Sequence, residues 1–135
     1  MTDRFYNLLG IRPQISSAKV TNNMGDDERF QNKTLRPILK LQNNLLLAVF
    51  SNYIHKHKNA FYSLTLEKRL EYIENVIQKD VKFRNSLKGI LIGQFTVEEY
   101  NIYIKNSSNL NKRMMCMVIV RLKDQVQLFD TPLMV

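Results

Sequence analysis

The chain has 135 residues, 44% hydrophobic and 24% charged, a composition typical of one globular domain that excludes disorder over most of its length. Its 20 lysines and arginines outnumber its 12 acidic residues, so the formal net charge is +8 and acidic partners are favoured. A single cysteine excludes an intramolecular disulfide, and neither a membrane-spanning apolar run nor a secretory signal is present, so we expect a cytoplasmic protein without membrane contacts.

The first 25 residues have the composition of an arm. They include two of the four glycines, one proline and a polar stretch at residues 16–23. Only Phe5, Leu8 and Leu9 have helical spacing there, enough for a short turn that can dock on the body or on a partner. We therefore expect residues 1–25 to be a flexible arm.

A helical domain is expected over residues 26–129. Acidic residues at 26–28 favour a helix start, and Pro37 predicts a break near Arg36 because proline lacks a backbone donor. Between residues 38 and 57, apolar side chains cover most of the helical circumference, which indicates a central helix.

The next helices are indicated by their caps. Thr65 and Asp80 are suited to cap amphipathic helices, and the segment from Thr96 to Glu99 has the form of a capping box. Gly89 and Gly93, one turn apart, predict a close helix crossing.

The C-terminal region permits two structures. Apolar residues from Met115 to Phe129 repeat at steps of three and four, which favours a helix, but the solid apolar run also permits a hairpin over residues 114–129. Residues 130–135 form a short apolar tail. The sequence thus predicts an all-α bundle of about five helices, with an α+β fold as the alternative.

The residues that usually carry chemistry are not arranged for it. His55 and His57 point roughly 200° apart on a helix and cannot share a metal ion. Cys116 lies among methionines and valines, which predicts a buried, inert thiol. No glycine-rich phosphate loop, nucleophile elbow or zinc signature occurs, so we expect a protein without enzymatic activity, cofactor or metal.

Basic residues recur at the starts of the expected helices, beside Asn and Ser donors. This is the chemistry of phosphate contacts, and it predicts a module that binds RNA or belongs to a ribonucleoprotein such as the ribosome. The alternative is a helical protein-interaction or homodimeric assembly module, in which apolar chain ends complete a neighbour's groove. The candidate nucleic-acid-binding residues are Arg29, Lys33, Arg36, Lys40, Lys79, Lys82, Arg84, Lys112 and Arg113.

Three segments carry a resemblance: residues 29–43 (RFQNKTLRPILKLQN), 83–89 (FRNSLKG) and 107–115 (SSNLNKRMM). In these segments, and over residues 26–129 as a whole, the chain resembles a family of short, uncharacterised bacterial proteins that automated naming sometimes calls glyoxalase. The resemblance implies a bacterial protein but no functional residues. Glyoxalases themselves share a metal-bearing βαβββ fold with scattered His and Glu ligands, whereas the two histidines of this chain lie two residues apart.

Overall fold

The computed structural model describes residues 2–15 and 20–129, and within these residues the regular elements are helical, with no strand. The all-α prediction is therefore confirmed. The hairpin alternative over residues 114–129 is wrong, because helix continues to Asp124 and a short 3-10 turn, Val126–Phe129, follows. The apolar tail expected at residues 130–135 lies outside the described residues. The α-helices are α1 Asp3–Ile11, α2 Asp26–Phe30, α3 Arg36–Lys56, α4 Leu66–Lys79, α5 Val81–Ile92, α6 Val97–Tyr103 and α7 Ser107–Asp124.

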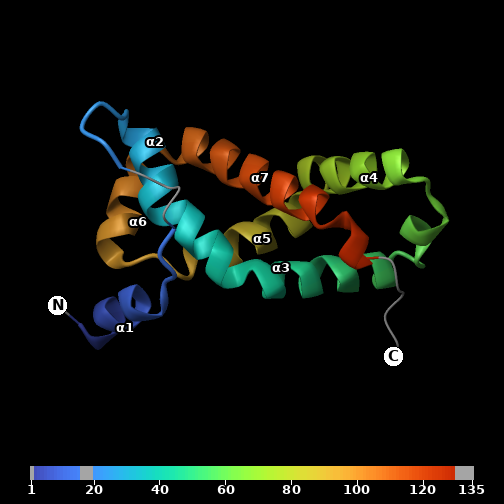
Figure 1. The fold of residues 1–135 in the computed structure, drawn as a ribbon, viewed down its shortest axis with the longest axis horizontal. Helices are drawn as coiled ribbons and strands as arrows, with labels where there is room; N and C mark the ends of the chain where they lie inside the picture. The colour runs from blue at the N-terminus through green and yellow to red at the C-terminus, as the bar shows by residue number, and fades with distance from the viewer. Residues whose placement is uncertain (1, 16–19, 130–135) are drawn as a thin grey trace.

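The long helices α3 and α7 follow the longest axis of the molecule, with α4 towards one end and α1, α2 and α6 at the other (Figure 1). The core lies between α3, α4, α5 and α7, each of which contributes fully buried apolar side chains. At its centre the Phe50 ring lies 5.2 Å from the Phe129 ring and 6.3 Å from the Phe61 ring, measured between ring centroids. Aromatic packing of this kind joins the 3-10 turn Val126–Phe129 to α3.

The expected break near Arg36 is wrong, because the chain stays helical from Asp26 to Lys56. A π-helical segment, Gln31–Leu35, joins α2 to α3, and the Arg36 amide donates to the Gln31 carbonyl. Pro37, which has no amide donor, follows directly after this wider turn as the second residue of α3, and the helix continues past it.

Two expectations about helix burial are also corrected. The α3 helix is not covered on nearly all sides, since Leu45 is 47% exposed while Leu46 and Phe50 are buried. No close crossing occurs at Gly89, because a Cβ atom placed there meets nothing within 4 Å.

The arm contains more structure than one turn. Helix α1 has nine residues and begins at the Thr2 cap, yet it includes no fully buried residue. Phe5 and Leu8 are half-buried, and the Arg4 guanidinium donates to the Gly93 carbonyl at 3.1 Å. The expected flexibility of residues 1–25 stays a prediction.

Candidate nucleic-acid interface

Between α3 and α7 lies an open hollow of about 680 Å³ with three cationic side chains, Arg36, Lys40 and Arg121. Its acidic residue is Asp124, and the rest of its lining comes from apolar side chains of both helices, from Cys116 and Gln125, and from Ile15 of the arm. Arg36 and Lys40 are one turn apart on α3, so both project towards α7. The hollow is therefore strongly positive.

Arg121 is held in this hollow by a pair of side-chain amides. Asn43 Nδ2 donates to Gln125 Oε1 at 2.9 Å, and Gln125 Nε2 donates back to Asn43 Oδ1 at 2.7 Å. Arg121 Nη1 donates to the same Asn43 oxygen at 3.3 Å. Burial lowers the pKa of the Arg121 guanidinium, and the positive charge of Arg36 lowers it further, partly offset by Asp124. Because the guanidinium stays charged, a bound anion would relieve this repulsion.

On the other side of α7, a second hollow of about 390 Å³ lies against α5 and the end of α4. It is lined by the cationic residues Arg84, Lys88 and Lys112 and by no acidic residue among those the structure describes. Arg84 Nη1 donates to the Gln78 carbonyl at 2.6 Å, which fixes its guanidinium near the helix junction. Lys88 follows Arg84 by one turn on the same face of α5.

The two hollows are separated by α7 alone, since Cys116 lines both. We call the six cations that line them, three on each side of α7, the basic face. Among the described residues, the ion pairs shown are Arg12–Glu99, Lys68–Glu71 and Lys123–Glu74, and none involves these six cations. The members of the basic face are Arg36, Lys40, Arg121, Arg84, Lys88 and Lys112.

The structure brings four of the nine candidate residues into the basic face: Arg36 and Lys40 on one side of α7, and Arg84 and Lys112 on the other. The remaining five lie elsewhere. Lys33 does not join Arg36 and Lys40, because the π-helical segment adds a residue per turn and offsets it.

Each of these five has different surroundings. Arg29 and Lys33 line a hollow that also contains Asp26, Asp27, Glu98 and Glu99, so their charge is balanced there. Arg113 donates to the Gln31 side chain at 2.8 Å. Lys79 and Lys82 are exposed at the junction of α4 and α5, outside both hollows of the basic face.

Sequence reasoning missed Lys88 and Arg121. The spacing of Lys88 from Arg84, four residues on a predicted helix, was a usable signal. Arg121 is far in sequence from Arg36, and only the packing of α7 against α3 places the two side by side.

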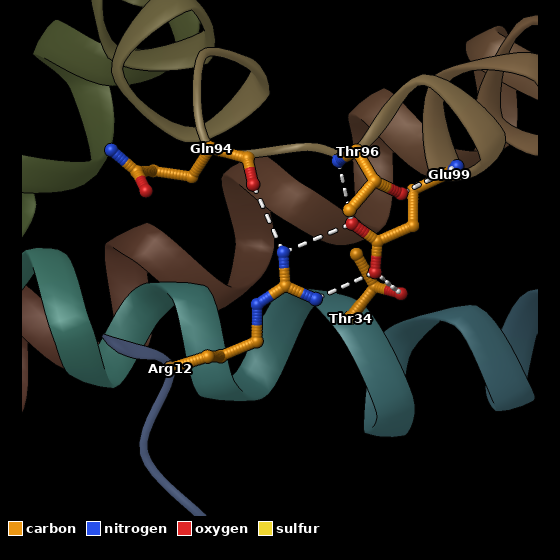
Figure 2. A network of polar contacts seen from close by, with 5 residues as sticks. All are labelled: Arg12, Thr34, Gln94, Thr96 and Glu99. Atoms are coloured by element: carbon orange, nitrogen blue, oxygen red, sulfur yellow. Dashed lines mark hydrogen bonds and ion pairs between the residues drawn. The ribbon is translucent and has the colours of Figure 1, made fainter. Parts of the chain in front are cut away.

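A separate polar network fastens the arm to the body (Figure 2). Arg12 donates twice to the Glu99 carboxylate, at 2.6 and 2.9 Å, and once to the Gln94 carbonyl at 2.9 Å. The side chains of Arg12 and Glu99 are only 8% and 13% exposed. Glu99 also accepts from Thr34 Oγ1 at 2.9 Å and completes the capping box predicted for Thr96. This network is structural, since every oxygen of the carboxylate is already engaged.

The prediction of a buried thiol is wrong, because Cys116 is exposed. Its neighbours in sequence, Met114 and Met115, are buried, so Cys116 lies on the outer side of α7. His57 stacks on Tyr53 with ring centroids 3.9 Å apart, and its Nδ1 lies 2.8 Å from the Tyr53 carbonyl. Across the described residues, no three His, Cys, Asp or Glu side chains are grouped so that they could hold a metal ion.

No helix in the described part of the chain is both long and apolar enough to span a membrane. A scan against protein-family models gives no match, and neither the curated proteins nor the solved structures contain a chain significantly similar to this one. The resemblance to the bacterial family therefore stays a prediction.

Proposed function

We propose that this protein is a non-catalytic RNA-binding module of the bacterial cytoplasm, and that it contacts RNA phosphates through the basic face. The observation that carries the proposal is the pair of hollows beside α7, each with three cations and together with one acidic residue. Lysine and arginine side chains that have no carboxylate partner gain most from phosphate, because binding releases the counterions that surround the nucleic acid.

The clustering favours this function over simple solubility. A surface that only keeps the protein in solution mixes charges of both signs, as the Lys68–Glu71 and Lys123–Glu74 pairs do elsewhere. In the basic face, burial and then the positive charge of Arg36 lower the pKa of Arg121, partly offset by Asp124. Arg36 and Arg121 therefore repel one another, and a bound polyanion would reduce this repulsion.

The test is the salt dependence of RNA binding, measured by fluorescence anisotropy with a labelled RNA of mixed sequence. The wild-type chain should bind at low salt, and its affinity should fall steeply as salt rises. In R84Q/K88Q/K112Q, the slope of log K against log salt should become smaller by about two to three, near one unit per lost phosphate contact.

A matched control removes the same charge from scattered positions. K56Q/K68Q/K105Q also lowers the net charge by three, but these exposed lysines lie outside the basic face. It should keep most of the wild-type slope. Equal losses in the two variants, or no binding of RNA at low salt, would refute the proposal. Copurification of RNA from cells, with and without RNase, tests the same function in its native setting.

A second candidate is self-association through the α6 end of the molecule. Val97, Tyr100, Ile102 and Ile104 are all exposed there, although they are apolar. A second copy of the chain would cover them. Light scattering at high micromolar concentration should then give a dimer that I102E converts to a monomer, whereas a monomeric wild-type protein contradicts this candidate.

A further inference from the structure

The two sides of the basic face differ in which helices supply their cations, but both border the same exposed side of α7. On one side Arg36, Lys40 and Arg121 line the hollow, and on the other Arg84, Lys88 and Lys112. Cys116 lies between them and lines both. A single strand offers one row of phosphates, whereas a duplex offers two rows across a groove. The two sets of cations, one on each flank of α7, therefore correspond to the two rows of phosphates of a duplex.

The side chains between the cations also argue against a single-strand site. No aromatic residue is among those that line the two hollows in the described chain. Proteins that bind single strands depend on aromatic side chains on which successive bases stack. The rings that are exposed here, Tyr6 and Tyr100, belong to α1 and α6 at the end of the molecule.

The apolar part of the lining indicates recognition by shape. Met117 and Val120 line one hollow, and Met115 and Ile119 line the other. These side chains offer no donor or acceptor to a base edge, so they cannot distinguish one base pair from another. The apolar part of the face therefore contributes to the fit of a ligand and not to the choice of its bases.

Two polar side chains favour RNA over DNA. Ser108 and Asn111 line the hollow beside α5, among its three cations. Asn111 Oδ1 accepts from the Tyr103 hydroxyl at 2.6 Å, which orients the amide and leaves its Nδ2 as a donor. A hydroxyl and an amide donor suit the 2′-hydroxyls that line the wide, shallow minor groove of an RNA duplex.

We propose that the basic face binds double-stranded RNA by shape, with α7 facing the minor groove and one set of three cations on the phosphates of each strand. This inference rests on the proposed function, since it names the form of RNA that the same face takes. It implies that the two hollows are occupied together and contribute separately to binding.

The experiment compares four ligands of one mixed sequence: an RNA duplex of about 20 base pairs, its two separated strands, and the corresponding DNA duplex. The full chain is titrated against each at several salt concentrations. We expect the RNA duplex to bind about tenfold or more tightly than either strand, because two rows of phosphates are contacted instead of one. The DNA duplex should bind more weakly than the RNA duplex, and an unrelated RNA duplex should bind equally well.

Two variants test the cations on the two sides of α7 separately. R36Q/K40Q keeps Arg121, which takes part in the Asn43–Gln125 contacts, and R84Q/K88Q/K112Q removes the opposite side. With the RNA duplex, each should reduce the salt slope by about two to three, and together they should reduce it by about five. Circular dichroism and thermal unfolding show that each variant folds, and N111A, which removes the amide donor, should narrow the difference between RNA and DNA.

The outcomes distinguish this inference from the function on which it rests. Single strands that bind as tightly as the duplex overturn the duplex inference and leave RNA binding intact. A DNA duplex that binds as tightly as the RNA duplex overturns the role of the minor-groove hydroxyls. If only one of the two variants, R36Q/K40Q or R84Q/K88Q/K112Q, has a smaller salt slope with the RNA duplex, the contact of one set of cations with each strand is overturned. If none of the ligands binds at low salt, the proposed function fails as well.

Discussion

Glu99 is the residue on which the attachment of the arm depends. It accepts hydrogen bonds from Arg12, Thr34 and the Thr96 amide, so one carboxylate joins α1, the π-helical segment and α6. Sequence analysis identified its role in the capping box, because a cap is a local pattern. It did not identify Arg12 as its partner, since the two residues are 87 positions apart.

In E99Q we expect α1 to detach while the helical domain stays folded. Glutamine preserves the capping box, but it leaves the Arg12 guanidinium without a carboxylate in a site where it is almost fully buried. Breaking such a pair costs about 3–5 kcal/mol if the cation stays in place, so the arm is expected to move into water instead. Hydrogen exchange of residues 3–11 should rise sharply in E99Q and remain unchanged in E98Q, which removes an exposed charge one residue away. Unchanged protection in E99Q would contradict this role.

The same pair predicts how the arm responds to pH. Burial acts to raise the pKa of Glu99, but hydrogen bonds from Arg12 and Thr96, the Arg12 charge and the Thr34 hydroxyl outweigh it and lower the pKa overall. A carboxylate with a lowered pKa stabilises the docked arm fully above its ordinary pKa, and this contribution is lost as pH falls through the lowered value. NMR signals of α1 should therefore be constant from pH 8 to about 5 and change only below about 4. Detachment between pH 5 and 7 would show that another group controls docking.

At the scale of elements, two glycines one turn apart differ: Gly89 lies within α5, and Gly93 caps its C-terminal end. Nothing lies within 4 Å of a Cβ atom at Gly89, but at Gly93 it would meet the Gly89 carbonyl oxygen at 3.1 Å. Alanine is a better helix former than glycine by up to about 1 kcal/mol, so G89A should raise Tm by roughly 2–5 °C. G93A should gain less or lower Tm, because the crowded carbonyl must shift. Thermal unfolding of both variants gives the comparison, and a lower Tm for G89A would indicate a contact at that position.

The helix boundaries show which parts of the fold are local. Thr65, Asp80 and Thr96 each cap the helix that the sequence assigned to them, because a cap depends on residues within one turn. The exposure of an apolar side chain, in contrast, depends on elements that are distant in sequence. The apolar residues of α3 are distributed around nearly the whole helix, so no pattern in its sequence indicates that Leu45 faces solvent. Likewise, the offset of Lys33 depends on a π-helical segment that Pro37 alone does not predict.

For the molecule as a whole, the arrangement of the basic face can be checked at its centre. Cys116 is the single cysteine of the chain and is exposed between the two hollows. In the native protein it should react with a maleimide within about tenfold of the rate in the unfolded chain. The RNA duplex should slow this reaction, and the bulky adduct should weaken RNA binding, whereas C116S should bind as the wild-type chain does. Full reactivity in the presence of saturating RNA would place the ligand elsewhere.

The manner in which α1 is attached has a thermal consequence. The helix buries no residue fully, and its apolar side chains Phe5 and Leu8 are only half-buried. The heat-capacity change of a transition comes mainly from apolar surface that enters or leaves water. The domain beneath the arm contains fully buried aromatic and aliphatic side chains, so its unfolding exposes more apolar surface per residue than release of α1 does. The free energy of arm docking is therefore expected to vary with temperature along a flatter curve than the free energy of unfolding of the domain.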